Sequence, residues 1–232
     1  ARNVAVGQES LASQNFTTAT TSYNTAVGMN AGRLVTTGVQ NTLIGGLAGD
    51  ALTDADNNTA LGYLALSAET NNNGNTAIGA ETLKVQNAGS GGDARNTAVG
   101  FLAGAAVSSG TQNTLVGYNS GNEMTSGSKN VILGSYDGNG GGLDIRTSSN
   151  NIVLSDGDGN PRLLINSDGN AYFNQGSSKF SGQAGLVSTT ANANHQCFSA
   201  ANEATSGTRF FHYFLIGTGH TNVGSITSTG SS

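Results

Sequence analysis

The chain has 232 residues, a formal net charge of −5 and only 10% charged residues. Its three Lys and six Arg are dispersed and form no basic stripe, which argues against a nucleic-acid partner. Gly occurs 35 times, about twice its usual ~7% share, and Asn occurs 28 times. Such a chain is expected to form many short strands joined by tight turns, and to rely on further copies of itself to bury a core.

A five-residue repeat, Asn-Thr-Ala-aliphatic-Gly, runs through residues 1–155. Successive copies begin 17 residues apart, or 21 apart at three places, so the unit has 17 residues with three insertions of four. The insertions fall within residues 8–23, 80–95 and 135–150. Nine copies with one period predict a solenoid of stacked coils. The first copy begins at Asn3 and a degenerate ninth at Asn151; the copies between them begin and end at Asn24 and Gly28, Asn41 and Gly45, Asn58 and Gly62, Asn75 and Gly79, Asn96 and Gly100, Asn113 and Gly117, and Asn130 and Gly134.

Each residue of the repeat has a predicted structural role. Thr and the aliphatic residue point to one face of a short strand, and the third residue, Ala or Leu, points to a crowded interior. The Gly ends the strand where the chain turns sharply or packs closely. The Asn tolerates left-handed dihedral angles, and stacked Asn residues could bond one another as a ladder. The Ala/Leu-rich segments between repeats, such as residues 29–35, predict either a single helical turn or a second strand in each coil.

The last third of the chain departs from the repeat. Residues 151–173 predict three strands with tight turns at residues 157–160 and 168–169. Residues 180–232 hold six of the fourteen aromatic residues and predict strands over 196–200 and 208–216. The expected organisation is therefore an all-β chain with a repeat shaft (1–155), a β-hairpin connector (156–179) and a C-terminal β-rich end domain (180–232). The longest apolar stretch, residues 210–217, is too short to span a bilayer.

These Asn-Thr-Ala-(Val/Ile/Leu)-Gly repeats resemble those of bacteriophage tail fibres, and they are similar to the head repeats of trimeric autotransporter adhesins. Adhesin heads commonly use a shorter unit, so the 17-residue period favours the phage fibres. Residues 151–173 resemble the segment ahead of the C-terminal knob of such fibres. Residues 224–232 resemble the junction that precedes a self-cleaving intramolecular chaperone.

The resemblance implies an intertwined homotrimer in the virion, outside the cell. Its expected partners are other tail proteins and a host surface polysaccharide or outer-membrane receptor, with no membrane insertion. Two alternatives remain open: a head fragment of an adhesin, and a tailspike that degrades surface glycan. The sequence offers no Ser/His/acid arrangement of a nucleophilic hydrolase, so the expectation is a structural, receptor-binding protein without enzyme activity or cofactor.

Three groups of residues raise the question of a metal site. The run from Asp156 to Asn160 echoes the start of a calcium loop, but it lacks the following Gly and has Ser167 where a Glu is needed, so a hairpin turn is favoured. For a cluster of three Asp residues, a solvated turn is likewise favoured over a metal site. Three isolated His residues could each approach their equivalents in the other chains on a trimer axis and bind a metal, but a role without metal is favoured for them. These residues are Asp50, Asp54 and Asp56, and His195, His212 and His220. The single Cys197 is expected to pack as a small apolar residue.

Receptor binding is predicted first for the end domain and second for the inserted loops. His212 and Tyr213 are the candidates in the end domain, because sugars favour an exposed aromatic ring beside polar groups. The insertions are the second candidate, because loops on a rigid scaffold commonly carry binding.

Overall fold

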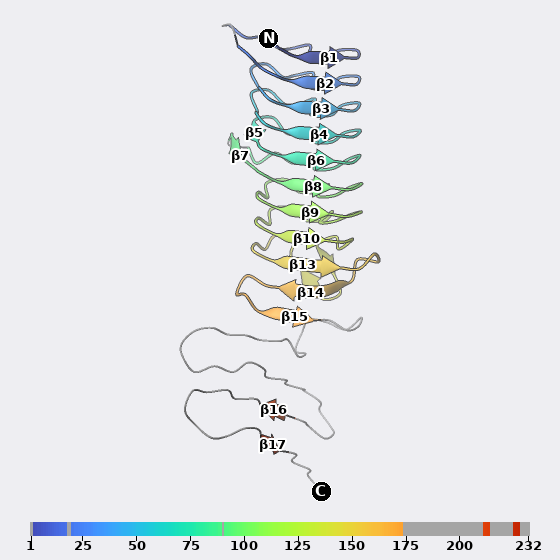
Figure 1. Ribbon diagram of the computed structural model, residues 1–232, viewed down its shortest axis with the longest axis vertical. Helices are drawn as coiled ribbons and strands as arrows, with labels where there is room; N and C mark the ends of the chain where they lie inside the picture. The colour runs from blue at the N-terminus through green and yellow to red at the C-terminus, as the bar shows by residue number, and fades with distance from the viewer. Residues whose placement is uncertain (1, 18–19, 90, 174–210, 214–224, 228–232) are drawn as a thin grey trace.

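The computed structural model of the protein describes residues 2–17, 20–89, 91–173, 211–213 and 225–227. Its main body is a rod of short strands stacked one above another (Figure 1). The described part of the chain contains no helix, so the predicted all-β solenoid is confirmed without helical turns. Eleven strands form one sheet: β1 (Val4–Val6), β2 (Thr25–Val27), β3 (Thr42–Ile44), β4 (Thr59–Leu61), β6 (Thr76–Ile78), β8 (Thr97–Val99), β9 (Thr114–Val116), β10 (Val131–Leu133), β13 (Ile152–Ser155), β14 (Pro161–Ile165) and β15 (Ala171–Phe173).

Each repeat contributes one strand of this sheet. The strands from β1 to β13 pair in parallel, and each residue faces its equivalent in the next repeat, as Ala26 faces Leu43. One repeat is therefore one coil. β14 and β15 then extend the sheet in antiparallel fashion, which confirms the three predicted strands and places their hairpins on the end of the same sheet.

The interior of the rod is built by the third residue of each repeat. Ala77 and Ala98 are fully buried, as predicted. Space inside a coil is shared between this residue and the one six positions later: Leu43 is accompanied by Gly49, whereas Ala77 is accompanied by Leu83. Where both positions hold small residues, as at Ala98 and Gly104, leucines of the neighbouring coils fill the space: a Cβ on Gly104 would stand 2.8 Å from Leu83 and 2.9 Å from Leu115. The expectation that other copies must complete the interior is therefore wrong, because the coils of one chain close it.

An asparagine ladder joins the coils, as predicted. The Asn58 backbone N–H donates to Asn41 Oδ1 at 2.9 Å, and the Asn75 N–H donates to Asn58 Oδ1 at the same distance. The amide group of Asn41 also donates to the Ala55 carbonyl at 2.7 Å, which fixes the turn of its own coil. These Asn side chains are buried, and each ladder bond satisfies a polar group that would be costly to leave unpaired.

The repeat Gly residues permit close packing between coils. At Gly62 the backbone φ is +141°, and a Cβ atom would stand 2.4 Å from the Gly79 carbonyl oxygen. The same position in Gly100 would bring a Cβ within 2.3 Å of the Gly117 oxygen. No larger residue fits without separating the coils, so the predicted role of this Gly is confirmed.

The left-handed residue at the start of each repeat is not the Asn. Positive φ angles occur instead one position earlier, at residues as different as Tyr23, Arg95 and Lys129. The Asn itself is held by the ladder bonds to both neighbouring coils, which leaves the preceding residue to make the sharp turn. The assignment of left-handed geometry to the Asn is therefore corrected.

The segment that follows each strand is neither a helical turn nor a second strand. Left-handed residues alternate there with others, as at Leu47 and Gly49 in the third coil. The N–H groups of these two left-handed residues go to opposite neighbouring coils: Leu47 donates to the Met29 carbonyl at 2.9 Å, and Gly49 donates to the Ala65 carbonyl at 2.9 Å. The Ala48 N–H between them bonds within its own coil, to the Gly45 carbonyl at 3.3 Å. We call the side of the rod that these segments form the second wall. Its coils are hydrogen-bonded to one another without a regular strand.

Two insertions and the chain's distal part form small additional sheets. The second insertion supplies β7 (Gly92–Asp93), which pairs in parallel with β5 (Asn72–Asn73), and the third forms a hairpin of β11 (Asn139–Gly140) and β12 (Leu143–Asp144). β16 (Phe211–Tyr213) lies within the strand predicted over 208–216 and pairs with β17 (Ser225–Thr227). The strand predicted over 196–200 falls outside the described residues. A helix long and apolar enough to cross a membrane is absent from the part searched.

Candidate interaction surface and polar sites

The outward side chains of the main sheet form two registered columns. One column is aliphatic or aromatic at all eleven strands, and we call it the aliphatic column. The second column holds Thr from β2 to β9 but changes to Val131, Ile152 and Ile165 toward the distal end. The aliphatic column consists of Val6, Val27, Ile44, Leu61, Ile78, Val99, Val116, Leu133, Leu154, Leu163 and Phe173.

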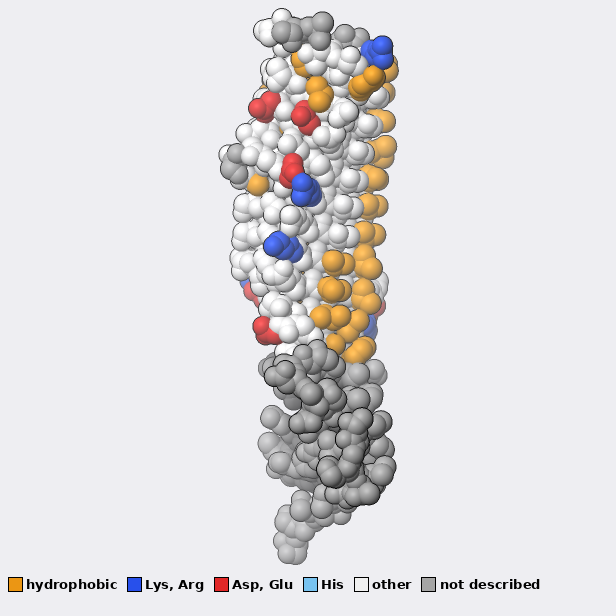
Figure 2. Space-filling view, turned by 60° about the vertical axis from the view of Figure 1, so that its left-hand side comes forward, with side chains coloured by type: hydrophobic (Ala, Val, Ile, Leu, Met, Phe, Trp, Pro, Cys, Tyr) orange, Lys and Arg blue, Asp and Glu red, His pale blue; other side chains and the backbone are white. Residues whose placement is uncertain are grey.

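This apolar column is exposed at six strands and half-buried at the other five. The exposed fraction is 57% at Val6, 43% at Leu61 and 49% at Phe173. The half-buried residues are Val27, Ile44, Ile78, Val99 and Leu163. Figure 2 shows the apolar side chains as a continuous stripe along one edge of the rod, widening toward the distal end. Neither column contains a charged residue, in a chain with 23 of them. An uninterrupted apolar stripe of this length is unusual on the surface of a monomer and indicates an interaction surface.

A row of side chains directly after the repeat Gly stands beside the aliphatic column, and it is large and apolar in four of the eight coils. Met29, Tyr63, Phe101 and Tyr118 are these large residues and are all about half exposed. The other coils have Gln8, Gly46, Ala80 and Ser135 at this position. The rings of Phe101 and Tyr118 stack with their centroids 6.0 Å apart and their planes 13° apart. The row widens the apolar surface on the side where the strands end.

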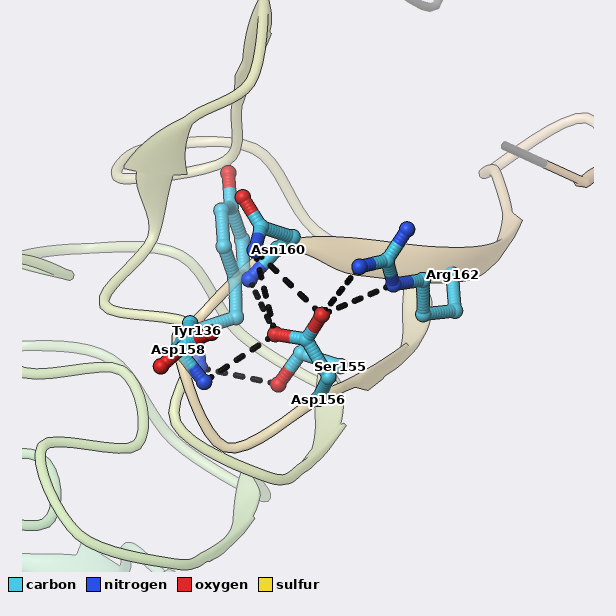
Figure 3. A network of polar contacts seen from close by, with 6 residues as sticks. All are labelled: Tyr136, Ser155, Asp156, Asp158, Asn160 and Arg162. Carbon is cyan, nitrogen blue, oxygen red and sulfur yellow. Dashed lines mark hydrogen bonds and ion pairs between the residues drawn. The ribbon is translucent and has the colours of Figure 1, made fainter. Parts of the chain in front are cut away.

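The run from Asp156 to Asn160 is a turn held by one carboxylate (Figure 3). Asp156 Oδ1 accepts the backbone N–H groups of Asp158 at 3.1 Å and Asn160 at 2.9 Å, and Oδ2 accepts the Arg162 Nε at 2.8 Å. The donors, led by the Asn160 N–H and followed by the Arg162 guanidinium, lower the pKa of Asp156 to about 2. Because both carboxylate oxygens serve the turn, the hairpin interpretation fits these contacts better than a calcium loop does.

Protonation of Asp156 is expected to loosen this turn. A carboxyl whose pKa is lower in the folded state stabilises the fold above its unfolded pKa of about 3.9, and that contribution disappears as the pH falls through the folded value. We therefore expect Asp156→Asn to melt below the unsubstituted protein at pH 6, because its neutral amide cannot pair with Arg162. That difference should shrink between pH 4 and pH 2, which circular dichroism melting would measure.

Asp158→Asn is the matched control for this experiment. Asp158 lies in the same turn, but it takes part through its backbone N–H, which the substitution leaves unchanged. It should melt like the unsubstituted protein at both pH values. A difference for Asp156→Asn that stays constant from pH 6 to pH 2 would contradict the assigned role of the carboxylate.

The cluster of Asp50, Asp54 and Asp56 does not converge on one point. Asp56 Oδ1 accepts the Val39 N–H at 2.7 Å, and Asp54 Oδ1 accepts the Thr53 hydroxyl at 3.1 Å. Burial raises the pKa of Asp50, an effect that hydrogen bonding and nearby Arg33 partly offset. The carboxylates thus have separate surroundings, and the described residues bring no three acidic, His or Cys side chains together as a metal site.

The predicted receptor residues His212 and Tyr213 lie in β16, where the structure defines the backbone pairing: His212 faces Ile226 and Tyr213 faces Ser225. Their side chains are outside the described part, as are His195, His220 and Cys197. The apolar columns and the row beside them were not singled out from the sequence as an interaction surface, although the outward direction of Thr and the aliphatic residue was predicted.

Comparison with known proteins gives no further guidance: no family model matches the chain, and no curated protein or solved structure shows significant similarity to it.

Proposed function

We propose that this chain is a structural, receptor-binding segment of a bacteriophage tail fibre, which works in the virion as a homotrimer and attaches to the host cell surface. The observation that carries the proposal is the charge-free apolar stripe on the outer face of an otherwise complete solenoid. A rod whose interior is already closed has no need of this stripe for its own core. Apolar side chains kept at every coil of such a rod are best explained by contact with identical rods.

The size of the outer face suits a stable assembly. Eleven strands at about 4.8 Å spacing give a length of roughly 50 Å, and outward residues about 7 Å apart along each strand, with the neighbouring row, give a width of about 15 Å. The resulting area is roughly 750 Å², compared with the ~800 Å² that each partner buries in one stable pairwise interface, and in a trimer each rod divides this area between two neighbours.

The change from Thr to Val and Ile along the second column of outward side chains favours a parallel, in-register assembly. Thr is found in the upper coils, whereas Val131, Ile152 and Ile165 replace it near β14. Copies that run in the same direction bring these wider apolar ends together. Antiparallel copies would place them against Thr hydroxyls. A parallel bundle of rods with one free end is the geometry that a fibre needs to present a receptor-binding tip.

The attachment role can be tested by cell binding. The full 232-residue chain, fused to a fluorescent protein, is expected to bind some strains in a panel of bacteria and to leave their polysaccharide intact. Removing the surface polysaccharide or the outer-membrane proteins from a binding strain should abolish the signal. Binding to no strain argues against attachment, and release of reducing ends from polysaccharide would favour the glycan-degrading tailspike instead.

A further inference from the structure

An open-sided cavity of about 520 Å³ lies beside the third insertion, away from the outer face of the sheet. One wall comes from residues 122–125 of the seventh coil and the other from residues 144–147, which begin at the last residue of β12. A cavity of this size lies within the range of roughly 300–1,000 Å³ that ligand sites occupy. Its lining consists of Asn122, Glu123 and Thr125 on one side, Asp144, Arg146 and Thr147 on the other, and Ala106.

The inserted wall is fixed to the coils. Tyr136 is fully buried, and its hydroxyl donates to the Leu143 carbonyl at 2.7 Å, which anchors the hairpin. The Thr125 N–H donates to the Arg146 carbonyl at 2.9 Å, and the Glu123 N–H donates to the Asp137 carbonyl at 2.8 Å. A site whose walls are joined by backbone hydrogen bonds loses little entropy on binding a ligand.

Two charged groups of the cavity are paired with each other. Arg146 pairs with Asp144 through two bonds, Nε to Oδ1 at 3.0 Å and Nη2 to Oδ2 at 2.8 Å. This contact lowers the pKa of Asp144, so its carboxylate is ionised at neutral pH. Among the described residues no side chain is bonded to the Glu123 carboxylate. Asn122, Thr125 and Thr147 complete the polar lining, and the Thr125 hydroxyl donates to the Arg146 carbonyl at 3.3 Å.

We infer that this cavity binds a neutral saccharide of the host surface, an inference that rests on the proposed attachment function. Adjacent sugar hydroxyls can donate to a carboxylate such as that of Glu123 and accept from an amide or guanidinium, as in other bidentate contacts. Ala106 and the Thr methyl groups offer apolar surface to the C–H faces of a sugar ring. The lining carries one more negative than positive group, which disfavours uronic acids and phosphorylated glycans.

The test measures binding of the full chain to immobilised oligosaccharides, neutral hexoses and N-acetylhexosamines in one set and uronic-acid polymers in another. We expect binding to members of the neutral set. The double variant Asn122→Ala with Glu123→Ala should bind them at least about tenfold more weakly, as expected for loss of a hydrogen bond to a charged group. Asp54→Ala, which removes an exposed carboxylate from a turn of the third coil, is the control and should bind like the unsubstituted protein.

Several results would overturn the inference. One is equal affinity of the double variant and the control, with both variants keeping the mass and circular dichroism spectrum of the unsubstituted protein. Another is a preference for the uronic-acid set. A chain that binds bacterial cells but no neutral saccharide also overturns the cavity assignment while leaving attachment standing, whereas a chain that binds neither contradicts the proposed function as well.

Discussion

Replacing Ala77 with Arg is expected to prevent stable folding of the rod. Ala77 is fully buried in the middle of the sheet, and the space beside it is filled by Leu83. An Arg there overpacks the coil and buries an unpaired charge, at a cost of several kcal/mol. That is a large part of the roughly 5–15 kcal/mol by which a folded domain is stable. Soluble yield and thermal unfolding by circular dichroism measure the effect.

Ala51→Arg is the control variant, because it adds an Arg without placing it in the buried interior. Ala51 is only partly buried in the second wall, and the equivalent positions in other coils carry the exposed residues Val85 and Glu123. The variant should therefore unfold within a few degrees of the unsubstituted protein. Wild-type melting of Ala77→Arg would mean that the third repeat residue does not face the interior.

The second large effect is expected at the aliphatic column. Leu61→Asp should separate the assembled copies, because it would place three carboxylates close to one another in a desolvated interface, each costing several kcal/mol. The single rod should remain folded, since Leu61 is 43% exposed on one chain and the interior does not depend on it. Light scattering would report the mass, and circular dichroism would report the strand content.

Val85→Asp is the matched control, because Val85 has nearly the same exposed fraction, 41%, but lies on the second wall. It should keep the mass of the unsubstituted protein. If both variants keep that mass, the aliphatic column is not the interface.

The sequence was sufficient to predict the strand and the buried residue of each coil, but not the structure of the second wall. One period with residues of fixed type predicted the strand, the buried third residue and the ladder, because stacked coils repeat one environment at each position. The left-handed position before the Asn carries Tyr, Gln, Arg or Lys in five coils and Asn or Gly in three, so residue type gave no consistent sign of it. Backbone bonds from neighbouring coils impose that geometry, and they also replaced the helical turn or strand expected at residues 29–35.

The polar cavity was beyond sequence reasoning for a different reason. Glu123 and Asp144 are 21 positions apart and meet only because the third insertion folds back against the seventh coil. Its anchor, Tyr136, occupies a position that holds Leu, Asn or Glu in other coils, a substitution that could have marked this insertion as structured. The exposed stripe could have been predicted more easily, because the outward direction of the aliphatic residue was already predicted. What was not predicted is that these residues form an interaction surface.

The most direct test of the whole account is the mass of the unsubstituted chain in native buffer, measured by light scattering over a range of concentrations. Three rods joined through the aliphatic column predict about three times the 23.2 kDa chain mass, unchanged on dilution. A folded, stable particle of 23.2 kDa would contradict the homotrimer and leave the apolar stripe unexplained.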